Sequence, residues 1–454
     1  MLSAYLNCMK IPELKKRILF TLGIVALCRV ASTIPCPGID PTALAELFKQ
    51  MSSNKGTGGV LDMLDLFSGG AMQNFAVGAL GIMPYISASI ILQLMTPVIP
   101  SLSKMLREGE AGHQKYNQIM RYVTVVICII QGVMFSLSMM HPEKLNLSGG
   151  GVVLHPGLGF MISTVITLTA GAMLIMWLGE MITDRGIGNG ASLIITVNII
   201  DRAPGAIANL FRMVFGVSAS GSADITPIHL LILVAMFLLV CAGAIALTQG
   251  MRKVPIRYAQ HQSGVGRNAA MMTSYLPLRV NYSGVMPIIF AGAILSFPMM
   301  LLRFLPNNWF FQKVVTIFQY GSTGYLILYG LLILVFSFFW VANQFNPIQI
   351  ADDLQKRNGY IPGVRPGQPT AEFLDHSMTR ITLAGAIFLT ALAILPMILS
   401  NAMGIPYVVA QFFGGTSLLI IVGVALDTMR QVETFLLNHH YDGFMSAGHI
   451  RSRR

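Results

Sequence analysis

The stretch from Gly78 to Gln93 reads GALGIMPYISASIILQ and lies in an apolar run, residues 75–99, that is long enough to cross a membrane as a helix. A simple membrane anchor would be filled with Leu and Val, whereas this run carries glycines, a proline, three consecutive small residues and an amide. Small residues let neighbouring helices approach closely, and Pro84 predicts a bend that leaves one carbonyl to be satisfied elsewhere. Ile82 and Ile86 lie four residues apart and share one helical face. The stretch therefore predicts a broken spanning helix beside a pathway.

A short amphipathic segment lies just upstream of this run. Leu61, Leu64 and Phe67 share one helical face, and the segment is too short to span a bilayer. It ends in Ser68-Gly69-Gly70, which predicts a hinge. We expect a movable element here, placed beside the broken helix.

The composition of the chain identifies its class. It has 454 residues, of which 54% are hydrophobic and 11% are charged, and its mean hydropathy is +0.66. Soluble domains carry about a quarter of charged residues, so the sequence predicts an all-α polytopic membrane protein. Hydropathy predicts ten transmembrane helices, at residues 18–34, 75–99, 119–140, 159–182, 191–211, 228–247, 285–305, 325–341, 381–400 and 407–437.

The distribution of basic residues predicts the orientation in the membrane. If the N-terminus is cytoplasmic, 22 of the 30 Lys and Arg residues fall on the cytoplasmic side and 8 fall outside or near that edge. Both termini are then cytoplasmic, as are the long loops 249–283 and 343–380, and the first apolar run is retained as an anchor. Five spans in residues 1–227 and five in residues 228–454 predict two halves of opposite orientation.

The residues that would carry enzyme chemistry are missing from the sequence. It contains no phosphate-binding loop of the ATPase type and no His-Glu-x-x-His motif. The five cysteines have no Cys-x-x-Cys spacing and are interpreted as small hydrophobic residues. Glu180 and Asp427 lie near cytoplasmic span ends, and Arg29 near the outer end of a span is interpreted as a satisfied packing residue. The pathway is therefore expected to be mostly apolar, which favours a hydrophobic constriction over an ion filter.

Two further segments stand out. Residues 176–190, MWLGEMITDRGIGNG, end with three glycines at alternate positions, which predict a tight cytoplasmic turn and not a dinucleotide-binding loop. Residues 345–367 predict a helix cap, one helix and then a stiff arm of Pro and Gly. This arm presents Arg365 at an exposed tip, where an arginine is well placed to dock a partner.

These segments, together with residues 282–287 (YSGVMP) and 413–420 (FGGTSLLI), resemble the signature segments of the SecY family, the channel subunits of the general secretory translocase. The likeness extends from about residue 12 to residue 431. It implies two inverted five-helix halves arranged as a clamshell, with a pore between them and a short plug helix at about residues 60–70. It also implies a channel that moves unfolded secretory polypeptides across the membrane and releases transmembrane segments sideways into it, without catalysis, cofactor or metal.

The resemblance also implies four sets of functional residues. The pore ring carries over to Ile82, Ile86, Ala191, Ile195, Met286, Ile289 and Ile420. The plug comprises Leu61, Asp62, Met63, Leu64, Asp65, Leu66 and Phe67. The lateral gate between spans 2–3 and 7–8 includes Ser87, Gln93 and Phe297. The docking positions on the cytoplasmic loops are Arg252, Lys253 and Arg365.

The implied partners are the small membrane subunits SecE and SecG, the motor ATPase SecA, the ribosome, signal-bearing polypeptides and membrane lipid, in the bacterial cytoplasmic (inner) membrane. No nucleic-acid specificity is expected. One alternative is a small-solute secondary transporter, which ten broken spans with inverted halves would also suit, but no midplane ion or substrate site is found in the sequence. An intramembrane enzyme would need a nucleophile with a base or a metal set, and the sequence shows neither.

Overall fold

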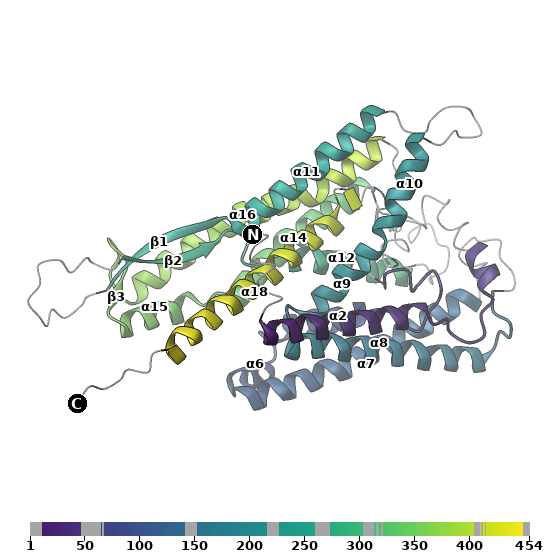
Figure 1. The fold of residues 1–454 in the computed structure, drawn as a ribbon, viewed down its shortest axis with the longest axis horizontal. Helices are drawn as coiled ribbons and strands as arrows, with labels where there is room; N and C mark the ends of the chain where they lie inside the picture. Colours follow the sequence, from purple (N-terminus) through teal and green to yellow (C-terminus); the bar gives the residue numbers. More distant parts are fainter. Residues whose placement is uncertain are drawn as a thin grey trace, which may run out of the picture.

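The computed structural model describes residues 11–46, 65, 68–140, 152–215, 227–258, 273–302, 313–314, 317–318, 321–403, 409, 412–413 and 415–447 (Figure 1). In the first half of the chain the helices are α2 (Pro12–Thr33), α5 (Met83–Met95), α6 (Pro100–Arg107), α7 (Glu110–Met140), α8 (Leu158–Arg185), α9 (Gly190–Asp201) and α10 (Ala203–Phe215). In the second half they are α11 (Pro227–Gln249), α12 (Met286–Leu302), α14 (Thr323–Gln344), α15 (Pro347–Lys356), α16 (Gln368–Met403) and α18 (Thr416–Ala447). The strands are β1 (Met251–Tyr258), β2 (Thr273–Arg279) and β3 (Gly359–Tyr360).

Long apolar helices dominate the molecule. In the described part of the chain, six helices are long and apolar enough to cross a membrane, or seven if α5 and α6, which are bent by 105° relative to each other, form one span. The apolar part of α12, Met286–Leu295, is shorter. The prediction of a polytopic helical membrane protein is confirmed, whereas the predicted count of ten spans is not reached by the helices that the structure describes.

The helices form two groups that lie side by side (Figure 1). In one group α8 packs against both α2 and α7, and in the other α16 packs against α14 and α11, while α11 also contacts α18. The groups meet where α5 packs against α12 and where α9 packs against α18. One hydrophobic cluster contains residues from all four of these helices.

The helix that carries Ile86 begins later than the sequence predicted. Residues 69–82 form a series of turns, and α5 starts at Met83 with Pro84 in its first turn. A proline in the first turn breaks no intrahelical hydrogen bond, because the first amides of a helix have no intrahelical acceptor. The predicted bend at Pro84, with its orphaned carbonyl, is therefore wrong, since Pro84 starts the helix.

The irregular backbone before α5 is covered by neighbouring helices. The Val77 amide donates to the Ile34 carbonyl (2.8 Å) and the Gly78 amide to the Ala31 carbonyl (3.0 Å) at the end of α2. From the other side, α8 approaches so closely that a Cβ at Gly171 would lie 2.0 Å from the Val77 carbonyl oxygen. Non-helical backbone at membrane depth is tolerated where protein covers it, and α2 and α8 provide that cover here.

The predicted fifth span, residues 191–211, is divided into two helices. α9 ends at Asp201, Arg202 is its C-cap, and α10 begins at Ala203 with Pro204 as its second residue. The Arg202 amide donates to the Ile199 carbonyl (3.1 Å), which tightens the last turn of α9. Pro204 has no amide hydrogen to continue the α9 ladder, so the helix breaks here and exposes the end of α9.

A small sheet joins residues of the two loops 249–283 and 343–380, so the described chain is mostly helical and not entirely α. The strand order is β2-β1-β3, and β1 pairs antiparallel with both neighbours. The sequence gives only a weak strand signal for β1. Its alternation of buried and exposed residues is limited to Val254 and Ile256, and a proline such as Pro255 between them is unusual within a strand. In the described sheet β3 pairs only with Arg257 and Tyr258 of β1. One side of β1 is therefore unpaired at Pro255, and the strand tolerates a residue there that has no amide hydrogen to donate.

The predicted glycine turn between α8 and α9 is confirmed. The Asn189 side chain accepts a hydrogen bond from the Ser192 amide (3.3 Å) and caps α9. Gly188 has φ +85°, a conformation that favours glycine. A Cβ at Gly190 would lie 1.9 Å from the Gly179 carbonyl oxygen. The turn therefore needs glycine for its conformation at one position and for close packing at another.

The predicted cap, helix and arm after α14 are confirmed as well. Asn346 caps α15 by accepting from the Gln349 amide (3.3 Å). The arm carries Arg365 between Gly363 and Gly367, which have φ +89° and +95°. The Arg365 carbonyl accepts from the Thr370 hydroxyl (2.8 Å) at the start of α16, so the backbone of this tip is fixed while its side chain is exposed.

Candidate functional site

The seven residues predicted to form the pore ring lie in one hydrophobic cluster. They come from four helices that are far apart in sequence, namely α5 with its N-cap, α9, α12 and α18. Ala191 and Met286 are half-buried and pack against the cluster. The other five have exposed fractions between 0% and 7%: Ile82, Ile86, Ile195, Ile289 and Ile420.

A cavity of about 230 Å³ opens onto this cluster. Every predicted ring residue except Ile420 lines it. The remaining lining comprises Met176, Gly179 and a set of aromatic and polar residues: Tyr85, Ser89, Gln93, Glu180, Thr183, Asn189, Ser192, Phe290 and Trp340. Aliphatic walls offer no hydrogen-bond partner to a passing chain and disfavour water and ions when the passage is empty. The arrangement therefore suits a constriction that closes by excluding water.

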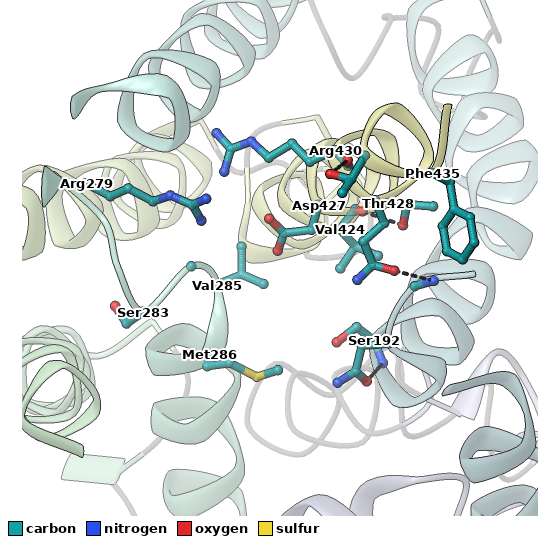
Figure 2. Close-up of a pocket in the computed structure, with 15 residues that line it drawn as sticks. Ser192, Arg279, Ser283, Val285, Met286, Val424, Asp427, Thr428, Arg430 and Phe435 are labelled. Atoms are coloured by element: carbon teal, nitrogen blue, oxygen red, sulfur yellow. Dashed lines mark hydrogen bonds between the residues drawn. The ribbon is translucent and has the colours of Figure 1, made fainter. Parts of the chain in front are cut away.

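A second, larger cavity of about 550 Å³ adjoins the first, with which it shares Asn189, Ser192 and Met286. Arg279 reaches into it from the end of β2, and Asp427 reaches into it from α18 (Figure 2). Its lining includes the charged side chains of Arg279, Asp427 and Arg430. The second cavity is therefore a polar vestibule that leads to the more apolar first cavity.

One hydrogen bond across this vestibule joins the two halves of the chain, and a second joins two helices of the second half. The Gln431 Oε1 atom on α18 accepts from the Gly188 amide in the α8–α9 turn (2.8 Å). The Arg430 guanidinium donates to the Thr248 carbonyl at the end of α11 (2.6 Å). These two contacts link α18 to the α8–α9 turn of the first half and to the end of α11 in the second half.

The residues predicted to line the lateral gate belong to α5 and α12, two helices that pack against each other. Ser87 is half-buried on α5, and Phe297 belongs to α12, although its side chain lies outside the description. Gln93 donates to Ser89 of its own helix (3.0 Å), and its Oε1 atom is buried and accepts no hydrogen bond from the described residues. The hydrogen bond that Gln93 donates is thus one within α5.

Sequence reasoning missed the aromatic residues at this gate. Phe290 on α12 packs edge-to-face against Trp340 (5.4 Å between ring centroids) and Phe336 (6.0 Å) of α14. Phe290 and Trp340 line the same cavity as Tyr85 and Gln93. The available signal was Trp340, one of three tryptophans in the chain, placed at the end of an apolar run. An apolar wall with aromatic rings offers a large contact surface to an apolar segment.

Of the predicted plug, Asp65 lies among the described residues, whereas Leu61, Asp62, Met63, Leu64, Leu66 and Phe67 lie outside them. Asp65 is 3% exposed and forms an ion pair with Arg202. Its Oδ1 atom accepts from the Gln73 amide (3.1 Å). A buried carboxylate requires such partners, so Asp65 is held firmly against the α9–α10 junction. Sequence reasoning counted Arg202 as an outside charge and missed this role.

The interpretation of Arg29 as a satisfied packing residue is confirmed. Its guanidinium donates to the Gly69 carbonyl (3.2 Å), to Asn198 Oδ1 (2.8 Å) and to Asp201 Oδ2 (3.2 Å). The side chain is 23% exposed, so it makes these contacts within the protein.

The predicted docking residues lie on one unit that is formed by the two long loops. Arg252 and Lys253 are exposed on β1, and Arg365 is exposed on the arm that follows β3. The pairing of β1 with β3 joins the two loops, and a hydrophobic cluster that includes Val254, Leu278, Ile361 and Leu374 supports them. The structure therefore assembles basic residues of two separate loops on a single scaffold.

No group of three or more metal-ligating side chains is found in the part of the chain that the structure describes. The Arg121–Glu180 ion pair (2.6 Å) joins α7 to α8 at the rim of the constriction. This ion pair links the two helices and adds a polar group to the cavity lining.

Comparison with known proteins places the chain among protein translocase subunits. The family model SecY matches residues 76–429. The chain is 39% identical to the protein translocase subunit SecY of Chlamydia trachomatis over 455 residues, 98% of each chain. It is 38% identical to the Escherichia coli K12 subunit over 442 residues, 97% of this chain and 95% of the relative.

Solved structures share the fold at low sequence identity. A protein-conducting channel covers 94% of this chain and 96% of its own, with a TM-score of 0.58 and 16% identity. Sec61 in a canine ribosome-channel complex from the endoplasmic reticulum covers the same shares, with a TM-score of 0.55 and 16% identity. These likenesses establish the architecture in which the constriction described above lies.

Proposed function

The chain belongs to the SecY family, and we propose how its parts divide the work of a protein-conducting channel. It is a channel subunit of a protein translocase and not an enzyme. The chain therefore has to let a polypeptide through, keep ions back and direct apolar segments into lipid. Each task is assigned here to a separate part of the structure.

The seven ring residues form the seal around the polypeptide. Aliphatic side chains from four helices touch an extended chain on all sides without offering a hydrogen bond that would hold it. Ala191 is small and loosens the ring on one side, while Met286 is flexible and adapts to different side chains. The convergence of all seven residues in one cluster, and of six of them on one cavity, is the observation that supports this assignment most directly.

The remaining parts open and close the passage. Ten spanning helices form two inverted halves, residues 1–227 and 228–454, which hinge at the outside loop between spans 5 and 6. Residues 61–67 are the plug that covers the outer side of the ring. Ser87, Gln93 and Phe297 line the lateral gate, through which an apolar segment leaves because its transfer to lipid gains roughly 0.8 kcal/mol per buried CH₂.

The cytoplasmic unit of β1, β2, β3 and α15 docks the machinery that supplies the polypeptide. Arg252, Lys253 and Arg365 attract the motor ATPase SecA or the ribosome, and the ribosome-bound Sec61 structure of the same fold supports this role. SecE-like and SecG-like subunits accompany the chain in the bacterial inner membrane. The excess of basic residues in loops 249–283 and 343–380 supports an orientation with both termini cytoplasmic.

Crosslinking to a stalled polypeptide tests the seal. In a variant without the five native cysteines, a cysteine at Ile86 or at Ile289 should crosslink to a secretory chain stalled in transit. The matched control is a cysteine at Ile288, which is equally buried but belongs to the cluster on the far side of α12. Failure of the ring positions to crosslink during active translocation, or equal crosslinking at Ile288, would defeat the assignment.

A transport assay separates this function from the secondary-transporter alternative. Proteoliposomes that contain only this chain should show no solute uptake driven by an ion gradient. Such uptake would favour a secondary transporter. We expect none, because a coupling ion needs a carboxylate site near the membrane midplane and the described residues show no such site.

A further inference from the structure

Two opposite charges face the polar vestibule without a partner. Arg279 ends β2 and Asp427 belongs to α18, and Figure 2 shows their charged groups pointing toward each other across the cavity. Both residues are exposed. Within the part of the chain that the structure describes, neither side chain forms an ion pair or a hydrogen bond. The guanidinium and the carboxylate are therefore available to a molecule that enters between them.

A third charge makes the vestibule positive. Arg430 follows Asp427 by three residues on α18, and its guanidinium is engaged by the Thr248 carbonyl (2.6 Å). The charged residues of the described lining are Arg279, Arg430 and Asp427, two cations and one anion, so one positive charge is in excess. A free guanidinium binds a carboxylate through two parallel hydrogen bonds. Arg279 is therefore the group in this lining that is best suited to hold an acidic side chain.

The two facing charges stand on rigid supports. Leu278, just before Arg279, is 1% exposed and belongs to the hydrophobic cluster that supports the docking residues. On the other side of Arg279, the Val280 amide donates to the Gly250 carbonyl (2.9 Å). On α18, Val424 is 4% exposed and belongs to the cluster that contains the ring. The backbone therefore holds each charge at a fixed place on its own wall.

The vestibule lies on the way to the ring. Ile420, Val424 and Asp427 are spaced by four and three residues, so they lie on one face of α18. Asp427 is thus about 10 Å further along the helix than the ring residue Ile420. The vestibule also shares Met286, a second ring residue, with the cavity of the constriction. A chain that reaches the ring through the vestibule passes these charges first.

We propose that Arg279 and Asp427 sense the charge of the entering polypeptide: Arg279 retains acidic side chains, and Asp427 limits this retention. The inference rests on the proposed passage of the polypeptide through the ring. The aliphatic ring treats all polar side chains alike, whereas the vestibule before it distinguishes them by charge. Removal of Asp427 leaves Arg279 and Arg430 unopposed, so an acidic stretch is held longer. Removal of Arg279 leaves one cation and one anion, so the preference disappears.

Export of matched substrates tests this role. One secretory polypeptide carries a run of glutamates and its twin carries glutamines at the same place, and the export time of each is measured in membrane vesicles without a membrane potential. In the unaltered channel the glutamate substrate should take about two to five times longer, the factor expected of one exposed charge pair. Arg279→Gln should bring this ratio back to about one, and Asp427→Asn should raise it by a similar factor. Arg279→Lys keeps the charge without the planar fork and should lie between the unaltered channel and Arg279→Gln.

Neighbouring charges outside the two cavities provide the matched controls. Asp184 and Arg185 are exposed at the end of α8 and line neither cavity, so Asp184→Asn and Arg185→Gln should leave the ratio unchanged. A purely structural role of Arg279 or Asp427 would lower the thermal unfolding midpoint and slow both substrates equally, and an unchanged ratio would overturn the proposal. Shifts of the ratio in the same direction in Arg279→Gln and Asp427→Asn would overturn it as well.

Crosslinking at the ring separates failure of this inference from failure of the channel assignment. A cysteine in place of Ile289 is tested for crosslinks to the stalled glutamine substrate in the same vesicles. If crosslinks form while the export ratio is the same in every variant, the channel assignment stands and charge sensing is wrong. If no crosslinks form during active export, the ring assignment fails and charge sensing fails with it.

Discussion

Truncation of Ile289 to Ala should make the resting channel leak, whereas the same truncation of Ile288 should leave it tight. The two residues are neighbours on α12 and are almost equally buried, at 2% and 1% exposure. Ile289 belongs to the cluster that contains the ring, and Ile288 belongs to the cluster between α11, α14 and α16. The pair therefore separates the effect of lost packing from the effect of a widened constriction.

The expected size of both effects follows from the loss of three buried carbons. Truncations of this kind in close-packed interiors cost about 2–5 kcal/mol, so both variants should lose thermal stability to a similar extent. In Ile289→Ala the lost contacts are those that hold the closed ring together. If about 2 kcal/mol of the cost falls on the closed state alone, the ratio of open to closed channels rises roughly 30-fold. We expect a resting conductance that rises by up to this factor.

The assay measures single-channel and macroscopic conductance of reconstituted channels without substrate, together with the thermal unfolding midpoint of each variant. Equal leakage of Ile288→Ala and Ile289→Ala would mean that conductance reports general loosening of α12 and not the ring. A tight Ile289→Ala channel with a lowered unfolding midpoint would remove Ile289 from the ring. In either case the aliphatic seal would need a different set of residues.

Three further predictions concern the scaffold and the docking surface. Gly190→Ala should lower the thermal unfolding midpoint sharply, because the added Cβ would lie 1.9 Å from the Gly179 carbonyl oxygen. Gly205→Ala in α10, where no atom lies within 4 Å of the added carbon, should leave the stability unchanged or raise it by up to about 1 kcal/mol. Equal unfolding midpoints of the two variants would contradict the close packing at Gly190. Arg365→Glu should block motor-driven export in membrane vesicles while the unfolding midpoint stays unchanged, and normal export would remove Arg365 from the docking surface. Burial raises the pKa of the Cys36 thiol to about 11, so at pH 8 only about a thousandth of this thiol is ionised to the reactive thiolate. Maleimide labelling of Cys36 in the folded protein should therefore be slow and should accelerate as the pH rises towards 11. Labelling at pH 8 that is as rapid as in the detergent-unfolded protein would contradict this burial.

Local patterns in the sequence predicted the parts of this protein that depend on near neighbours. The alternate glycines at 186–190 predicted a turn, and the structure has one, since the backbone conformation there follows from the missing side chains. Asn346 and Pro347 predicted the start of α15 for the same local reason. By contrast, Pro84 was wrongly expected to bend a helix. Residues just before it donate backbone hydrogen bonds to the end of α2 and form turns, so the helix starts only at Met83, and these distant partners cannot be read from the local sequence.

Apolar run length determined from sequence alone that this is a polytopic membrane protein, since the bilayer acts on every residue by its hydropathy whatever the fold. Recognisable motifs added the family and the ring positions. The tertiary structure decided which side chains from distant segments meet: Ile82, Ile195, Ile289 and Ile420 in one cluster, β1 beside β3, and Arg29 and Arg202 on either side of Gly69 and Gly70. A guanidinium interacts with whatever lies within a few ångströms of it, and that distance is set by how helices pack and not by position along the chain. The glycines that the sequence marked as a hinge are, for this reason, a tight turn between two guanidinium groups.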